Sequence, residues 1–174
     1  EFRRVLFRSE HQVGRLHEAG GRYAEALELA QQRADRSAEA TLRNNLGLVR
    51  QAEGEVAQAA ELFRQAMVLN QAMGRLESEA SNHVNLGMLA EARQDYEAAE
   101  REYERALELD KAAEQRMEIA ADLLRLGRIT DRRGLPDRAL AYAERAYRSY
   151  LAQGALAEAR SSLSQAMASA RKMD

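Results

Sequence analysis

The stretch Asn85-Leu86-Gly87 predicts the fold, because the chain returns to it at a fixed interval. Asn45-Leu46-Gly47 precedes it and Arg125-Leu126-Gly127 follows it, each at an interval of forty positions, and Val13-Gly14 is a weaker copy. The residues that follow each glycine recur as well. They are Ala26, Ala59, Ala99 and Ala139 at the twelfth place, Ala30, Phe63, Tyr103 and Ala143 at the sixteenth, and Ala66, Ala106 and Ala146 at the nineteenth. Such a period is the signature of stacked structural repeats.

The composition predicts an all-helical protein. The 174 residues include one proline, no cysteine and no tryptophan, and the abundant residues Ala, Leu, Glu, Arg and Gln are strong helix formers. A formal net charge of −2 with interspersed signs gives no reason to expect binding to nucleic acid or to a membrane surface. No apolar run reaches the roughly 18 residues of a membrane span. Without cysteine a reducing, cytoplasmic location is expected.

Residues 1–9 differ in character from the rest of the chain. Their sequence, Glu-Phe-Arg-Arg-Val-Leu-Phe-Arg-Ser, resembles the in-frame translation of a sequencing adapter, and no initiator methionine precedes it. The alternative is a native amphipathic start, with Phe2, Val5 and Leu6 on one helical face. We predict a non-native leader over 1–9, a single domain over 10–174, and therefore a fragment of a longer protein.

Each repeat is expected to be a pair of antiparallel helices, here named A and B. We predict four repeats, at about 10–36, 37–74, 75–114 and 115–154, with turns at Gly20-Gly21, Gly54, Gln94-Asp95 and Gly134 to Asp137. Ser37 is the expected N-cap of the second repeat, and Pro136 is expected in the first turn of the last B helix. Residues 155–174 are expected to form a terminal helix with an apolar stripe at Leu156, Ala159, Leu163, Ala166, Met167 and Ala170. We predict that this helix caps the last repeat; the alternative is that it is the first helix of a degenerate fifth repeat.

Leu-Gly followed by Ala, an aromatic residue and Ala at these offsets resembles the tetratricopeptide repeat, over about residues 10–154. The 40-residue spacing is similar to the longer-helix variety of kinesin light chains and bacterial regulators. The first repeat departs with Arg33 in place of the third alanine, and the fourth lacks the aromatic residue. The resemblance implies a right-handed α-solenoid, in which glycine and alanine allow helices to approach closely. It also implies a non-catalytic interaction module that binds an extended peptide or a partner helix in the concave groove lined by the A helices.

The candidate groove residues follow from that resemblance. The place two before each glycine holds Gln12, Asn45, Asn85 and Arg125, and in the long-helix relatives an asparagine there commonly binds a peptide backbone. An amide both donates and accepts hydrogen bonds, although Asn45 and Asn85 could instead bond neighbouring helices. The whole candidate face consists of Asn45, Leu48, Gln51, Asn85, Met88, Glu91, Arg125, Arg128 and Arg132.

The fourth repeat carries a row of basic residues on this face. Arg125, Arg128 and Arg132 have i, i+3, i+7 spacing, and guanidinium groups suit carboxylates and phosphates. We therefore expect an acidic or phosphorylated partner segment near this repeat, unless Asp122 and Asp131 neutralise the arginines. The family's lysine clamp for C-terminal carboxylates does not match.

No pattern of catalytic, cofactor-binding or metal-ligating residues is present, so an enzyme is not expected. His83 is interpreted as a packed residue, and the acidic run Glu97, Glu100, Glu102 and Glu104 as a solvated helix face. The sequence thus favours a protein-interaction scaffold. The alternative is a regulatory or sensor arm of a larger ATPase, kinase or transcription regulator. The partner's identity and the oligomeric state stay open.

Overall fold

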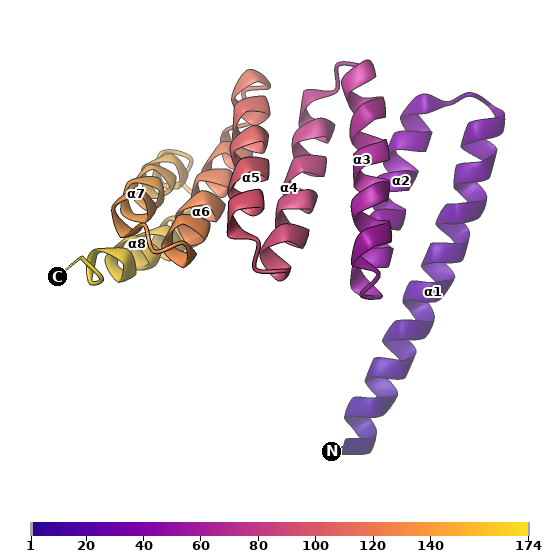
Figure 1. Ribbon diagram of the computed structural model, residues 1–174, viewed down its shortest axis with the longest axis horizontal. Coiled ribbons are helices and arrows are strands. Elements are labelled where there is room, and N and C mark those ends of the chain that lie inside the picture. Colours follow the sequence, from indigo (N-terminus) through magenta and orange to yellow (C-terminus); the bar gives the residue numbers. More distant parts are fainter. Residues whose placement is uncertain (1, 174) are drawn as a thin grey trace. The chain divides into compact units, whose positions relative to one another are not determined.

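A computed structural model describes the backbone of residues 2–173 and the side chains of residues 14–173. The expectations for Phe2, Val5, Leu6 and Gln12 concern side chains outside that range. All regular structure in the described part is α-helical, as the composition predicts (Figure 1). The helices are α1 (Phe2–Gln32), α2 (Arg36–Ala52), α3 (Val56–Ala72), α4 (Leu76–Ala92), α5 (Tyr96–Ala112), α6 (Arg116–Arg132), α7 (Pro136–Ala152) and α8 (Leu156–Ala170).

The helices follow the period of the sequence throughout. The A helices α2, α4 and α6, and the terminal helix α8, begin at Arg36, Leu76, Arg116 and Leu156. The turns that join consecutive helices contain a residue with positive φ at every twentieth position: Ala34, Gly54, Gly74, Gln94, Glu114, Gly134 and Gly154. This conformation favours glycine, which explains why four of the seven are glycine. Pro136 begins α7, as expected.

The expected turn at Gly20-Gly21 is wrong, because α1 continues through both residues to Gln32. A Cβ on Gly20 would lie 3.3 Å from Val49 Cγ1 of α2. The glycine therefore allows close packing of two helices at a modest cost in helix propensity. The first repeat consequently has no helix pair within residues 10–36.

The true register of α1 follows from the same period. Ala19, Tyr23 and Ala26 stand one full period before Ala59, Phe63 and Ala66, so the C-terminal half of α1 has the sequence pattern of a B helix. Gly14 therefore does not correspond to Gly47, Gly87 and Gly127. The 33-residue interval between Gly14 and Gly47 is not a repeat length of the structure.

The N-cap of α2 also differs from the expectation. Asp35, rather than Ser37, caps the helix, because its Oδ1 accepts a hydrogen bond of 2.9 Å from the amide of Ala38. Asp95 caps α5 in the same way through Ala98. Ser37 lies inside the first turn, and its hydroxyl oxygen accepts a hydrogen bond from Arg75.

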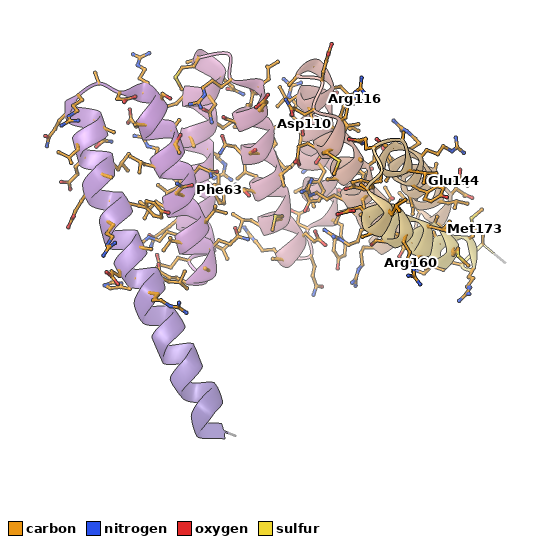
Figure 2. All side chains as sticks on the ribbon, turned by 180° about the vertical axis from the view of Figure 1, so that it is seen from behind. Phe63, Asp110, Arg116, Glu144, Arg160 and Met173 are labelled. Carbon is orange, nitrogen blue, oxygen red and sulfur yellow. The ribbon has the colours of Figure 1, made fainter. Side chains whose placement is uncertain are left out.

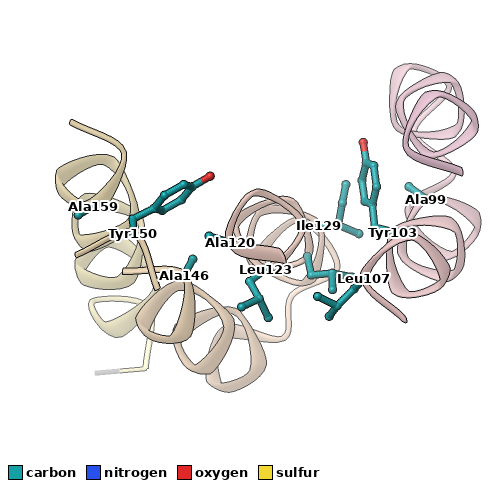
Figure 3. Packing of buried hydrophobic residues seen from close by; sticks show 10 residues of the cluster. Ala99, Tyr103, Leu107, Ala120, Leu123, Ile129, Ala146, Tyr150 and Ala159 are labelled. Carbon is teal, nitrogen blue, oxygen red and sulfur yellow. The ribbon is translucent and has the colours of Figure 1, made fainter. Parts of the chain in front are cut away.

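The chain divides into two compact units, Glu1–Arg75 and Leu76–Asp174. Within the first, α2 packs against α1 and α3; within the second, each of α4 to α8 packs on its neighbour in sequence. The core of the second unit is a continuous cluster of buried residues from α5, α6, α7 and α8 (Figure 3). Tyr103, Leu123, Ile129 and Tyr150 are among its large members, and small alanines separate them.

The recurrent glycines make room for an aromatic ring, as the repeat pattern suggests. Gly47 faces the fully buried ring of Phe63, and Gly87 faces that of Tyr103. In the last pair, where alanine replaces the aromatic residue, the amide of Gln165 from α8 takes up the space beside Gly127. Thus α8 compensates for the missing ring of α7.

The expected apolar stripe of α8 is only partly correct. Its small residues Ala159 and Ala166 are buried, together with Ser162 and Ser169. The large members of the stripe, Leu156, Leu163 and Met167, are exposed. Met167 stands where the three earlier helices have glycine, so this position on α8 offers no niche for an aromatic ring.

The acidic run of α5 is not a uniformly solvated face. Glu100 is buried and forms ion pairs with Arg133 and Arg138, whereas Glu97 stays exposed. Burial of a carboxylate requires such partners. His83 is packed, as expected: it is buried, and its Nδ1 lies 2.7 Å from Glu102 Oε2.

Candidate functional site

The predicted groove residues of the second unit lie on corresponding faces of α4 and α6. Asn85, Met88 and Glu91 project from α4, and Arg125, Arg128 and Arg132 occupy the equivalent or adjacent positions on α6, one repeat later. Asn85 is half-buried and Met88 is exposed, so polar and apolar surface alternate along α4. In the first unit, Asn45, Leu48 and Gln51 form the equivalent face of α2, with Leu48 exposed and the two amides half-buried.

Arg128 and Glu91 connect α4 to α6 directly. Arg128 donates from Nε to Glu91 Oε1 at 2.9 Å and from one terminal nitrogen to Oε2 at 2.8 Å. The hydroxyl of Tyr103 donates to the same Oε2 at 3.0 Å. Burial and the neighbouring Glu91 raise the pKa of Tyr103. A paired guanidinium and carboxylate of this geometry fix each other's orientation.

Arg125 is held by the carboxylate of its own helix. Its Nη1 lies 2.7 Å from Oδ1 of Asp122, which is fully buried. Arg132, by contrast, is an exposed residue at the end of α6. Two of the three arginines therefore have carboxylate partners within the protein, and much of the expected basic character of this row is offset.

A cavity of about 370 Å³ opens beside Asn85 and Arg125. Its lining comes from α4, the C-terminal end of α5, the following turn and α6, and includes Glu77, Asn85, Asp110, Gln115, Glu118 and Arg125. The amide of Gln115 donates to Glu77 Oε1 across the rim. Its volume falls in the range of ligand sites, about 300–1,000 Å³, although the walls are mainly polar.

Two buried carboxyl groups lie at one side of this cavity. Asp110, near the C-terminal end of α5 and labelled in Figure 2, is 3% exposed and interacts electrostatically with the fully buried carboxyl group of Asp122 on α6. Two carboxylates are acceptors only, so a hydrogen bond between these two groups would need a proton on one of them. Burial raises the pKa of Asp122 to about 7 despite the opposing charge of Arg125, and burial also raises the pKa of Asp110.

Sequence reasoning did not include Asp110, Glu77 or Glu118 in the candidate site. A signal for Asp110 exists in the period, since Asn70 stands at the equivalent place one repeat earlier and Tyr150 one repeat later. All three are buried. A charged residue at a position that is otherwise neutral and buried indicates a special environment.

Neither a metal-ligand cluster nor a membrane-spanning helix occurs in the described part of the chain. No group of three or more His, Asp or Glu side chains there could hold a metal ion. Among the helices of the same part, none is long and apolar enough to span a bilayer.

The fold and this surface define a class: an all-α protein of antiparallel helix pairs in repeats of constant length. Residues 78–152 match one model of the tetratricopeptide repeat, and residues 41–77 match a second. These matches run over more than half of the 174 residues. The chain belongs to the tetratricopeptide repeat family.

Solved structures with the same fold include BtubC (BKLC) from P. vanneervenii, at a TM-score of 0.75 and 23% identity. That match covers 81% of this chain and 59% of BtubC, so this chain spans a little over half of its length. The TPR-like repeats of a putative kinesin light chain from Podosopora anserina match at a TM-score of 0.65 and 21% identity, over 98% of this chain and 94% of that one. MamA matches at a TM-score of 0.58 and 21% identity, over 95% of this chain and 94% of MamA. No curated protein sequence matches the chain.

Proposed function

We propose that the chain is a non-catalytic interaction module that binds an extended protein segment along the A-helix face of α4 and α6. One observation carries the proposal: a polar cavity lined by Asn85 and Arg125 opens on this face, and Met88, three residues after Asn85 on α4, is exposed. An extended segment offers backbone donors and acceptors that an amide can pair and side chains that a cavity can select.

The corresponding face of α2 supports the same activity in the first unit. Asn45 repeats Asn85, and the exposed Leu48 repeats Met88. Asparagine at this place gives affinity for a main chain of any sequence, whereas the exposed apolar residue favours an apolar side chain. Each unit can thus contact a few residues of a partner.

Selection of an acidic stretch would depend chiefly on Arg132. Arg128 is engaged with Glu91 and Arg125 with Asp122, so an acidic ligand must compete with these internal carboxylates. Arg132 lies at the exposed C-terminal end of α6. We expect any acidic preference to be confined to that end.

The scaffold can also serve as the regulatory arm of a larger signalling protein. In support, the match to RapI, with a TM-score of 0.58, covers 91% of this chain but 63% of that protein. The same kind of helix array therefore occurs as part of longer chains. The sequence that flanks this chain in its gene would separate the two readings.

A peptide library displayed to the ¹⁵N-labelled full chain tests the proposal. Ligands should shift amide resonances of α4 and α6, and Asn85→Ala should weaken all of them similarly while leaving the melting temperature nearly unchanged. The matched control is Arg105→Ala, since Arg105 is exposed on α5, a B helix. If the shifts instead lie on α5 and α7, or if Asn85→Ala and Arg105→Ala behave alike, the assignment of the A-helix face is wrong.

A further inference from the structure

We propose that the cavity beside Asp110 is a site for an organic cation, namely the guanidinium or ammonium group of a basic side chain on the partner segment. This inference rests on the proposed function, because the cation is a side chain of the bound partner segment. It adds that the cavity selects a positively charged side chain.

The charges around the cavity are unbalanced. Glu77, Asp110 and Glu118 line it, Asp122 lies behind Asp110, and Arg125 is the basic residue among its lining residues. The electrostatic neighbours of Asp110 are these same groups: Asp122, Glu118, Arg125 and Glu77. Four carboxyl groups thus share one guanidinium. A cleft of one sign concentrates ligands of the opposite sign.

The pairing of Arg125 leaves a second carboxyl group without a cation. Arg125 donates to Oδ1 of Asp122 at 2.7 Å, whereas Oδ2 of Asp122 is buried and has no hydrogen-bond partner in the described part of the chain. Asp110 is 3% exposed and lines the cavity, and its neighbour Asp122 is itself acidic. A buried carboxyl group is stabilised by a donor, preferably a charged one. The free space next to Asp110 is where such a donor would fit.

A guanidinium or ammonium group suits this lining better than a metal ion does. Both groups are donors only, and the lining offers carboxylate oxygens on α4, α5 and α6 as acceptors. No set of three ligating side chains in the described residues has metal-site geometry. The volume of about 370 Å³ also exceeds what a bare ion needs.

The acidic pair is confined to one repeat, so it can set the register of a bound segment. At the positions of Asp110 and Asp122, the preceding repeat has Asn70 and Asn82, and the following one has Tyr150 and Ser162. The asparagines carry no charge. Tyr150 belongs to the packed core (Figure 3). Of these three repeats, only the one with Asp110 and Asp122 therefore offers carboxyl groups at these positions to a basic side chain of the partner.

The test uses the full chain and a small probe, N-acetyl-arginine methylamide, followed by ¹H–¹⁵N NMR up to about 50 mM, where even weak sites of millimolar Kd are occupied. The neutral isostere N-acetyl-citrulline methylamide is the matched ligand control. The arginine probe should give saturable shifts at residues 77–85, 110–118 and 125, and it should bind about tenfold or more tightly than the citrulline probe, as charge-assisted hydrogen bonds imply.

Two variants report on the cavity itself. Asp110→Asn introduces the residue of the preceding repeat and should remove the preference for arginine over citrulline. Glu118→Gln changes an exposed lining residue and should reduce the preference without any effect on folding. The matched control is Glu108→Gln, which removes an exposed carboxylate close to Asp110 in the sequence.

The possible results separate this inference from the proposed function. Equal binding of the two probes, no saturable shifts, or equal effects of Asp110→Asn and Glu108→Gln would overturn the cation site. Library peptides could still bind the A-helix face in that case, and the proposed function would stand. Conversely, arginine binding in the cavity without any peptide binding to α4 and α6 would overturn the scaffold assignment, and with it the partner segment as the source of the cation, while the preference of the cavity for a cation would stand.

Discussion

A Cβ atom on Gly87 would lie 2.6 Å from Cε1 of Tyr103, closer than a side chain can approach an aromatic ring. The preceding repeat has the same relationship between Gly47 and Phe63, at the same distance. Both rings are fully buried, so they cannot move into solvent. The glycine thus lets the A helix lie against the aromatic residue of its own B helix.

The first prediction is that Gly87→Ala destabilises the protein. Overpacking against the ring costs about 1–3 kcal/mol, and a gain of up to about 1 kcal/mol in helix propensity offsets part of it, which leaves a net loss of about 2 kcal/mol at the upper end of these values. Gly21→Ala is the control, because residue 21 is also helical and a Cβ there meets nothing within 4 Å. That variant should be stabilised. Urea unfolding measures both, and a Gly87→Ala midpoint at or above that of the wild type would show that the ring yields easily.

A second prediction concerns the hydroxyl group of Tyr103. Tyr103→Phe should retain the packing, because Phe63 fills the equivalent niche one repeat earlier. It removes the hydrogen bond of 3.0 Å to Glu91, which should cost roughly 0.5–1.5 kcal/mol in the free energy of unfolding. In a Glu91→Ala background the same substitution should cost much less. A double-mutant cycle measures this, and a coupling energy of zero would contradict the contact.

A third prediction ranks the glycines. Gly127→Ala should destabilise the protein less than Gly87→Ala, because its nearest obstacle is the amide end of Gln165, which can rotate away. The next obstacles are backbone atoms, Ala139 O at 3.3 Å and Ala143 N at 3.4 Å. In a Gln165→Ala background the cost of Gly127→Ala should fall below about 1 kcal/mol. Identical costs in the two backgrounds would mean that α8 does not fill this niche.

Sequence periodicity predicts most of the fold but not the first repeat. The spacing of Gly47, Gly87 and Gly127 locates the helices from α2 to α6 within a few residues, because each glycine is required by a packing contact. Gly14 resembles a member of this series but makes no such contact. Gly20-Gly21 resembles a turn, yet helical hydrogen bonding continues through it. Local propensity could not resolve this, since glycine is common both in turns and at close helix contacts.

The helices that carry the candidate face could be predicted from sequence, but the ion pairs on that face could not. The repeat places Asn85, Arg125 and Arg128 on A helices, as expected. Which carboxylates the arginines contact depends on how neighbouring helices are placed. Glu91 pairs with Arg128 from α4 to α6, and Asp110 of α5 reaches Asp122 of α6. Such pairings depend on how helices from two repeats pack beside each other, which the sequence period does not give. The cavity likewise forms between side chains of three helices, so the sequence period could not predict it.

The last prediction concerns the pH dependence of stability. Burial raises the pKa of Asp122 to about 7, whereas aspartate in an unfolded chain titrates near 3.9. Between about pH 4 and pH 7 the folded protein therefore binds a proton that the unfolded chain has released. The contribution of this group to the free energy of unfolding must then fall as pH rises through that interval, and the cost is fully present above about pH 7.

Asp122→Asn should remove this dependence, since Asn82 shows that the amide is accommodated at the equivalent place of the preceding repeat. The amide oxygen can still accept the hydrogen bond from Arg125. The free energy of unfolding of the variant minus that of the wild type should therefore be larger at pH 8 than at pH 5. The increase should be at least about 1 kcal/mol, because one pKa unit corresponds to about 1.4 kcal/mol. Urea unfolding at both pH values measures the difference, with Glu108→Gln as the exposed control. A difference that is the same at pH 5 and pH 8 would mean that Asp122 is ionised at both pH values in the folded protein.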